Sequence, residues 1–83
     1  MATVIIYTTP WCPYCIRAKK LLDQKNVTYT EIDVSEHEAR SKMVALTGGR
    51  TVPQLLINDH PTGGCDELYA LEGNGKLDKL LSR

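Results

Sequence analysis

The hydrophobic and polar positions of the chain follow first a strand pattern and then a helical one. A nearly continuous apolar run rich in β-branched residues covers 3–8, which is typical of a strand buried on both faces. From Pro13 onward the apolar positions repeat with helical spacing, as at Ala18 and Leu22, and basic side chains occupy the other side. Proline is favoured as the first residue of a helix, so Cys12 is expected at the N-cap.

The middle of the chain repeats this order. Alternating residues over 27–34 predict a second strand. Ser35 followed by Glu38 is a capping-box pattern, which predicts a helix that runs to about residue 46. Gly48 and Gly49 supply its C-terminal stop. The buried side of this helix is expected to contain Ala39, Met43 and Leu46.

The last part of the chain predicts a hairpin and two helical segments. A strand over 52–57 leads into a tight turn at Asn58-Asp59 and a short return strand over 60–62. A helical segment over 66–71, a Gly-rich break and a short helix over 76–81 follow. The final helix is expected to turn Leu77, Leu80 and Leu81 inward.

This order of elements predicts an α/β fold. The first strand, helix and second strand should form a right-handed crossover with parallel strands. The third and fourth strands should form an antiparallel hairpin. We therefore expect a four-stranded mixed β-sheet flanked by helices, in a single domain that spans residues 1–83.

Composition narrows the functional class. The 83 residues carry no net charge and no basic block, which argues against nucleic-acid binding through bulk electrostatics. No apolar run approaches the roughly 18 residues of a membrane span. Residues 1–4 lack the features of a signal peptide, and three cysteines are an odd number, unlike a secreted disulfide framework. We expect a cytoplasmic monomer.

Two cysteines lie where the first strand meets the first helix. A helix N-terminus or nearby cations lower a cysteine pKa from about 8.5 into roughly the 3.5–7.5 range, which favours the reactive thiolate. Cys12 is therefore the expected nucleophile, and the more interior Cys15 is suited to resolve a mixed disulfide. The alternatives are two incidental core cysteines or structural zinc. Zinc requires a second pair of ligands. The remaining candidates, His37, His60 and Cys65, do not have the spacing of a zinc-ligand pair, so no metal is expected.

The segment Thr51-Val52-Pro53 has two interpretations. A cis bond before the proline would turn the Val52 backbone outward, so that its N–H and C=O could pair with an extended peptide substrate. Alternatively, the proline ends a strand or lies on a sheet edge. The residues alone do not decide between these alternatives.

A second loop, Gly63-Gly64-Cys65-Asp66, precedes a predicted helix. Two glycines allow a ligand to approach backbone N–H groups that favour an anion, and the Asp66 carboxylate would accept a ligand ammonium. Such a site suits the zwitterionic end of an amino acid. The alternative, which this loop alone favours, is a plain glycine hinge before a capped helix. Cys65 by itself indicates a small buried hydrophobe.

Together these motifs resemble the glutaredoxin family. Cys12-Pro13-Tyr14-Cys15 is identical to the dithiol active site of that family. Thr47-Gly48 followed by 50–54 resembles its second-helix end and cis-proline loop, and 63–68 resembles its third signature. The resemblance covers essentially the whole chain in the right order and spacing. It implies a minimal thioredoxin fold (βαβαββα) and glutathione-dependent disulfide reduction.

The resemblance also implies individual roles. Cys12 would attack glutathionylated substrates and hold glutathione as a mixed disulfide, and Cys15 would resolve mixed disulfides formed with protein disulfides. Glutathione is then the reducing co-substrate, and the partners are glutathionylated or disulfide-containing proteins. Without the family resemblance, Arg40 would be interpreted as a surface charge. The resemblance implies that its side chain pairs with the glycine carboxylate of glutathione. The residues implied in glutathione binding are Tyr14, Arg40, Thr51, Val52, Pro53, Gly64, Cys65 and Asp66.

The chain departs from the family pattern at three positions. Many glutaredoxins carry a lysine where this chain has Thr9, so one cation near the thiolate is absent. Trp11 before the motif is more typical of thioredoxins, and Glu67 stands where an aspartate is common. Two other functions stay open. One is an iron–sulfur cluster held between two subunits through Cys12, which Pro13 disfavours; the other is a disulfide reductase fed by a flavoenzyme without glutathione.

Overall fold

The computed structural model describes residues 3–81 of the chain. Its elements follow the predicted order: β1 (Val4–Thr8), α1 (Pro13–Gln24), β2 (Thr30–Asp33), α2 (His37–Thr47), β3 (Gln54–Ile57), β4 (His60–Gly63), α3 (Cys65–Gly73) and α4 (Lys76–Leu80). Within the part described, none of the helices is long and apolar enough to cross a bilayer.

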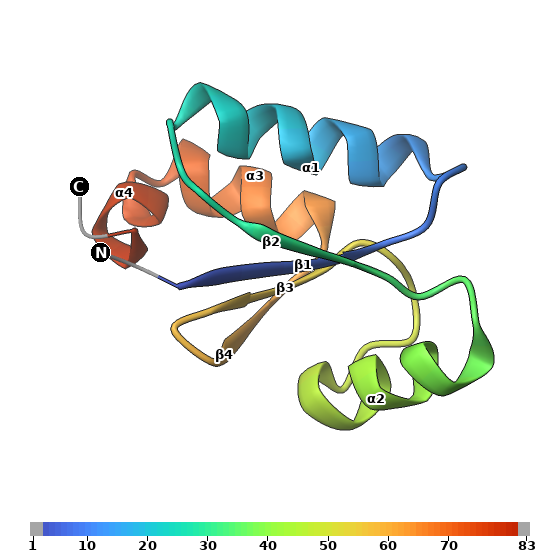
Figure 1. Cartoon of the computed structure of the whole chain (residues 1–83). Coiled ribbons are helices and arrows are strands. Elements are labelled where there is room, and N and C mark those ends of the chain that lie inside the picture. The colour runs from blue at the N-terminus through green and yellow to red at the C-terminus, as the bar shows by residue number, and fades with distance from the viewer. Residues whose placement is uncertain (1–2, 82–83) are drawn as a thin grey trace.

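The strands form one mixed sheet in the order β2-β1-β3-β4. β1 and β2 are parallel, as the crossover through α1 requires, and β3 is antiparallel to both β1 and β4. Helices α1 and α3 cover one face of the sheet, and α2 covers the other (Figure 1). The predicted α/β fold, a minimal thioredoxin fold with a four-stranded mixed sheet, is confirmed.

The two central strands contribute to two cores, which explains their nearly continuous apolar sequences. In β1, Ile6 joins the core beneath α1 and α3, whereas its neighbour Tyr7 joins the core beneath α2. In β3, Leu55 and Ile57 face the first core and Leu56 faces the second. Successive side chains of a strand point to opposite faces of the sheet, so neighbouring residues of both strands are apolar wherever each face packs into a core.

The second strand is shorter than the predicted 27–34, because the residues before Thr30 close α1 instead. Asn26 adopts a left-handed conformation with φ 56°. The N–H of Val27 then donates to the Leu22 carbonyl at 3.2 Å. β2 begins only where Thr30 comes into register with Ile5 of β1.

The capping-box prediction for the second helix is wrong. The N-cap of α2 is Glu36, and no side chain caps the helix. Ser35 is engaged elsewhere, since its backbone N–H and its hydroxyl both donate to Asp33 Oδ1, at 2.7 and 2.6 Å. Gly48 ends the helix in the left-handed region with φ 76°, as predicted.

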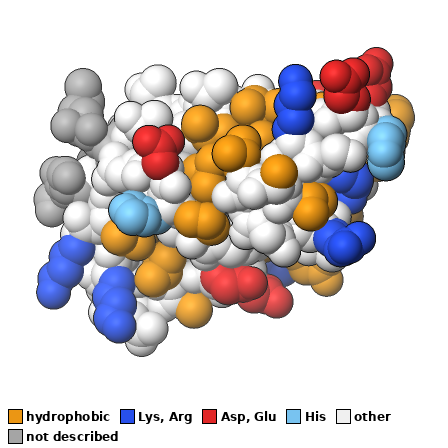
Figure 2. Space-filling view, turned by 90° about the horizontal axis from the view of Figure 1, so that it is seen from below, with side chains coloured by type: hydrophobic (Ala, Val, Ile, Leu, Met, Phe, Trp, Pro, Cys, Tyr) orange, Lys and Arg blue, Asp and Glu red, His pale blue; other side chains and the backbone are white. Residues whose placement is uncertain are grey.

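Two leucines expected to be buried are exposed. Leu46 is 57% exposed, because the inner stripe of α2 runs from Met43 to Thr47, whose hydroxyl donates to the Met43 carbonyl. Leu80 is 36% exposed, and the buried leucines of the C-terminal segment are Leu77 and Leu81. Figure 2 shows hydrophobic side chains gathered at the surface on the α2 side of the molecule.

Candidate active site

Cys12 lies at the N-cap of α1, as the sequence predicts. Its backbone is extended, and Pro13 occupies the first helical turn. The Cys15 N–H donates to Cys12 Sγ at 3.2 Å, and the Cys12 thiol donates to the Val52 carbonyl at 3.6 Å. The sulfur is partly exposed. A backbone N–H at a helix N-terminus favours an anion at the atom it meets.

Cys15 has different surroundings. Its side chain is 1% exposed. Burial, followed by the hydrogen bond with Cys12, raises the pKa of Cys15 to about 12, although a backbone hydrogen bond from Thr9 acts in the opposite direction. Cys12, Cys15 and Cys65 are all free thiols. At neutral pH, Cys15 is therefore a protonated thiol held beside a more accessible sulfur.

The loop before β3 brings the backbone of Val52 to Cys12. The Val52–Pro53 peptide bond is cis, as the family resemblance implies. Pro53 is buried and Val52 is half-buried. The Val52 carbonyl faces the Cys12 sulfur, so an extended chain attached to that sulfur would lie along this loop.

The start of α3 packs directly on the same loop. Gly64 is the N-cap of α3, and a Cβ at this position would lie 2.9 Å from the Pro53 carbonyl oxygen. Gly63 has φ 90°, a left-handed conformation in which side chains are strained. Glycine at 64 thus allows two loops distant in the sequence to meet. Asp66 is exposed in the first turn of α3.

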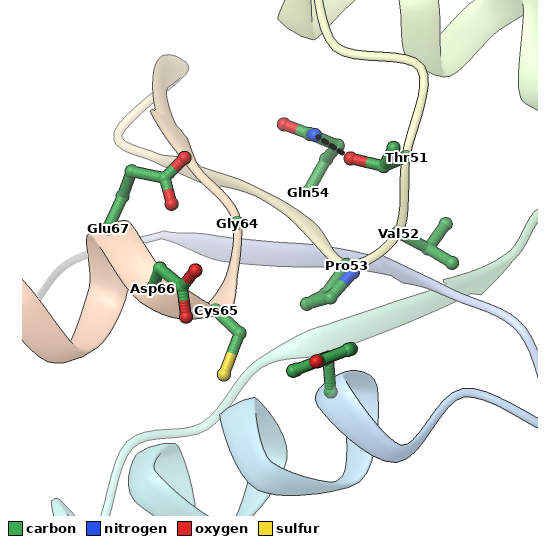
Figure 3. A pocket seen from close by; sticks show the side chains of 9 residues that line it. Thr51, Val52, Pro53, Gln54, Gly64, Cys65, Asp66 and Glu67 are labelled. Carbon is green, nitrogen blue, oxygen red and sulfur yellow. Dashed lines mark hydrogen bonds between the residues drawn. The ribbon is translucent and has the colours of Figure 1, made fainter.

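A cavity of about 380 Å³ opens between these segments. Figure 3 shows the acidic side chains of α3 on one side and the loop before β3 on the other. The lining residues are Tyr14, Thr51, Val52, Pro53, Gln54, Gly64, Cys65, Asp66 and Glu67. Seven of the eight residues expected to bind glutathione thus line one pocket, and Cys12 contacts its Val52 edge.

Arg40 is the expected site residue that does not line this pocket. It lies on α2, and its Nη1 donates to the Arg50 carbonyl at 2.8 Å. It borders a separate hollow of about 270 Å³ with His37, Ser41 and Val44. The guanidinium is therefore held near the loop that leads into the pocket, outside the cavity itself.

Sequence reasoning did not assign two of the lining residues. Gln54 is 7% exposed, and its amide donates to Thr51 Oγ1 at 3.5 Å. Gly49 makes room for it, because a Cβ there would collide with the Gln54 side chain. Glu67 follows Asp66 on α3. It was not assigned to the site because the family commonly has an aspartate at this position. The signal for Gln54 was its place directly after Pro53 in the matched motif.

Within residues 3–81, no three His, Cys, Asp or Glu side chains gather as metal ligands would. The site consists of one partly exposed cysteine at a helix N-terminus, one buried cysteine behind it, and a pocket of mixed polar and apolar lining beside them. Such an arrangement can exchange disulfides with a ligand whose backbone or carboxylate groups bind in the pocket.

Comparisons with known proteins agree with this chemistry. Residues 4–61 match the glutaredoxin family model. A glutaredoxin of Pseudomonas aeruginosa is 53% identical over 83 residues and covers 99% of both chains. The solution structure of a glutaredoxin from Brucella melitensis is similar with a TM-score of 0.86 and 54% identity, covering 98% of this chain and 89% of that one. The crystal structure of a buckwheat glutaredoxin–glutathione complex is similar with a TM-score of 0.88 and 32% identity, covering 98% and 77%.

Proposed function

The chain belongs to the glutaredoxin family, and on this basis we propose that it is a glutathione-dependent thiol–disulfide oxidoreductase. Its substrates are protein disulfides and protein–glutathione mixed disulfides. The observation that carries this proposal is the position of Cys12 at a helix N-terminus, against the Val52 edge of the pocket. The buckwheat relative, whose structure is a glutathione complex, supports glutathione as the co-substrate.

In the proposed complex, the extended backbone of glutathione pairs with Val52, and Tyr14 flanks it. The γ-glutamyl end meets the N–H groups at the start of α3 and the carboxylate of Asp66. The Arg40 guanidinium exchanges its bond to the Arg50 carbonyl for the glycine carboxylate of glutathione, a stronger, charge-assisted partner. Thr51, Pro53, Gly64 and Cys65 complete the walls of the pocket.

Reduction of a glutathionylated protein takes two exchanges. The Cys12 thiolate attacks the glutathione sulfur, so that a Cys12–glutathione disulfide forms while the protein–glutathione bond breaks and the protein thiolate takes up a proton. The thiolate of a second glutathione then attacks the bound glutathione sulfur. Oxidised glutathione leaves, and Cys12 is a thiolate again.

Reduction of a protein disulfide also needs Cys15. Cys12 attacks one substrate sulfur and releases the other as a thiolate. Cys15 then loses its proton and attacks Cys12, which frees the reduced protein and leaves a Cys12–Cys15 disulfide. Two glutathione molecules reduce this disulfide in succession, and oxidised glutathione is the product. We place these reactions in a reducing cytoplasm and in a monomer.

Serine substitutions separate the two cysteines. Cys12→Ser is expected to abolish glutathione-dependent reduction of a small glutathione mixed disulfide, since Cys12 is the partly exposed thiol at the Val52 edge of the pocket, whereas Cys15 and Cys65 are buried. Cys15→Ser should retain much of that activity but lose the reduction of protein disulfides. Oxidised glutathione is followed through glutathione reductase and NADPH.

Folding of both variants is checked by circular dichroism. Full activity of Cys12→Ser would contradict the mechanism. Turnover with thioredoxin reductase in place of glutathione would instead favour a reductase fed by a flavoenzyme.

A further inference from the structure

Trp11 is a large apolar side chain beside the nucleophile, and the proposed chemistry does not use it. It is the single tryptophan of the chain and directly precedes Cys12. Its side chain is 86% exposed, and it does not line the pocket proposed for glutathione. Exposed apolar residues scattered singly are ordinary, so its position at the reacting sulfur is what requires an explanation.

A second exposed apolar residue belongs to the same helix start. With Cys12 as the N-cap of α1, Trp11 and Ile16 occupy the two positions that pack together in a hydrophobic staple. Here Ile16 is 57% exposed and Trp11 86% exposed, so most of the apolar surface of both residues faces water. Apolar surface of this kind is favourable to bury against a partner.

Beyond Ile16, the surface of α1 carries charged side chains. Ile16 borders a shallow groove that it shares with Lys19, Lys20, Asp23 and Tyr29. Lys19 is paired with Glu31 at 2.9 Å, whereas Lys20 has no carboxylate partner within residues 3–81. The surface is thus apolar next to Cys12, and one helical turn further on it presents Lys20, with Asp23 in the same groove.

We propose that Trp11, Ile16 and Lys20 form a docking strip for the polypeptide that flanks a target disulfide. Its occupant is an extended substrate segment with an apolar residue beside the reactive cysteine and an acidic residue further along. A protein sulfur attacked by Cys12 remains attached to its own chain, which must cross the rim of the site. This inference rests on the proposed function and divides the substrate surface: glutathione binds in the pocket, and the polypeptide binds along α1.

The single tryptophan makes the strip directly observable. In Cys15→Ser, a peptide carrying a thiopyridyl-activated cysteine flanked by leucine and glutamate is trapped on Cys12; the new disulfide forms as thiopyridone leaves. Because Trp11 becomes covered, its emission should shift to shorter wavelength. Trapped glutathione should leave the emission maximum in place. The same emission maximum with peptide and with glutathione would overturn the proposal.

Kinetics supply a second test in the protein with both active-site cysteines. Trp11→Ala and Ile16→Ala should each raise KM for a protein disulfide about fivefold more than KM for a small glutathione mixed disulfide, since only the former covers these side chains. Lys20→Glu should reverse the preference between peptides with acidic and basic flanks. Leu46→Ala is the matched control, because Leu46 is also 57% exposed but lies on α2.

Equal changes for both substrates, or changes as large in Leu46→Ala, would overturn the docking strip. A loss of kcat in Trp11→Ala with both substrates would do the same, since it would mean that Trp11 acts on Cys12 itself. If the wild-type chain does not turn over with glutathione, the proposed function fails, and the emission shift still decides for or against the strip.

Discussion

Cys12 and Cys15 lie three residues apart at the start of α1, yet only one of these two residues is exposed to water. Cys12 is partly exposed, and it accepts the Cys15 N–H at 3.2 Å. Cys15 is 1% exposed, and burial is the main reason why its pKa rises to about 12. Burial also raises the pKa of the Cys65 thiol. This difference supports the proposed roles, in which Cys12 attacks and Cys15 resolves the mixed disulfide.

This difference predicts an order of alkylation. Iodoacetamide at neutral pH should label Cys12 first and Cys15 far more slowly, because alkylation needs a thiolate and the Cys15 proton is retained until the pH approaches about 12. In Cys12→Ser, labelling of Cys15 should stay slow, since burial, the largest cause of its raised pKa, remains. Peptide mass spectrometry measures each site, with the urea-unfolded chain as the control. Equal labelling of Cys12 and Cys15 in the folded protein would refute the assignment.

At the scale of elements, the pocket depends on how closely α3 approaches the loop before β3. Gly64 sits where a Cβ would lie 2.9 Å from the Pro53 carbonyl oxygen, tighter than ordinary van der Waals contact. Both groups are backbone, so neither can move aside as a flexible side chain would. Because Gly64 has no Cβ, the start of α3 can lie directly against the loop before β3. This close approach positions the α3 residues that we propose bind glutathione.

Gly64→Ala should lower the free energy of unfolding by roughly 1–3 kcal/mol, as overpacking does, and raise KM for glutathione. Gly73→Ala, at the other end of the same helix, has no neighbour within 4 Å of the added methyl. It should raise the free energy of unfolding by about 0.5–1 kcal/mol through helix propensity. Urea denaturation measures both variants. If they prove equally stable, the close approach does not constrain the site.

At the scale of the whole molecule, one ionic contact links β1, β2 and α1 behind the active site. The hydroxyl of Thr8, 3% exposed, donates to Glu31 Oε2 at 2.7 Å, and Lys19 pairs with the same oxygen at 2.9 Å. The Thr8 bond, followed by the Lys19 bond, holds the pKa of Glu31 below its ordinary 4.5. Lys19 stands four residues after Cys15, so this contact fixes the helix that carries both sulfurs.

A lowered folded pKa gives stability that is complete above the ordinary value of 4.5 and is lost as the pH falls through the folded pKa. Glu31→Gln should therefore reduce the free energy of unfolding at pH 7 by about 1 kcal/mol, a small value because the pair is half-exposed. At pH 3 the difference from the wild type should shrink. Urea titrations at both pH values test this, with Glu38→Gln on α2 as the control. A difference that is independent of pH would contradict the proposed role of the charge.

The sequence by itself determined the elements and their order. Strand and helix periodicities are local, so residues within one window specify β1, α1 and β3, and the crossover rule then makes β1 and β2 parallel. The place of Cys12 at a helix N-terminus followed from Pro13 alone. The local residues left two interpretations of the segment before Pro53 open. The family resemblance favoured the cis bond, which the structure contains.

Only the tertiary structure decided which side chains share a surface. The pocket joins Tyr14, the loop before β3 and the start of α3, and no local pattern measures the distance between such segments. For the same reason the sequence did not assign Gln54 to the pocket, misplaced Leu46, and gave no sign that Arg40 meets the Arg50 carbonyl. The exposure of Trp11 beside Cys12 likewise depends on what the fold leaves uncovered. Sequence periodicity predicts which face of its own helix or strand a side chain occupies. The packing between elements determines which other residues that side chain contacts.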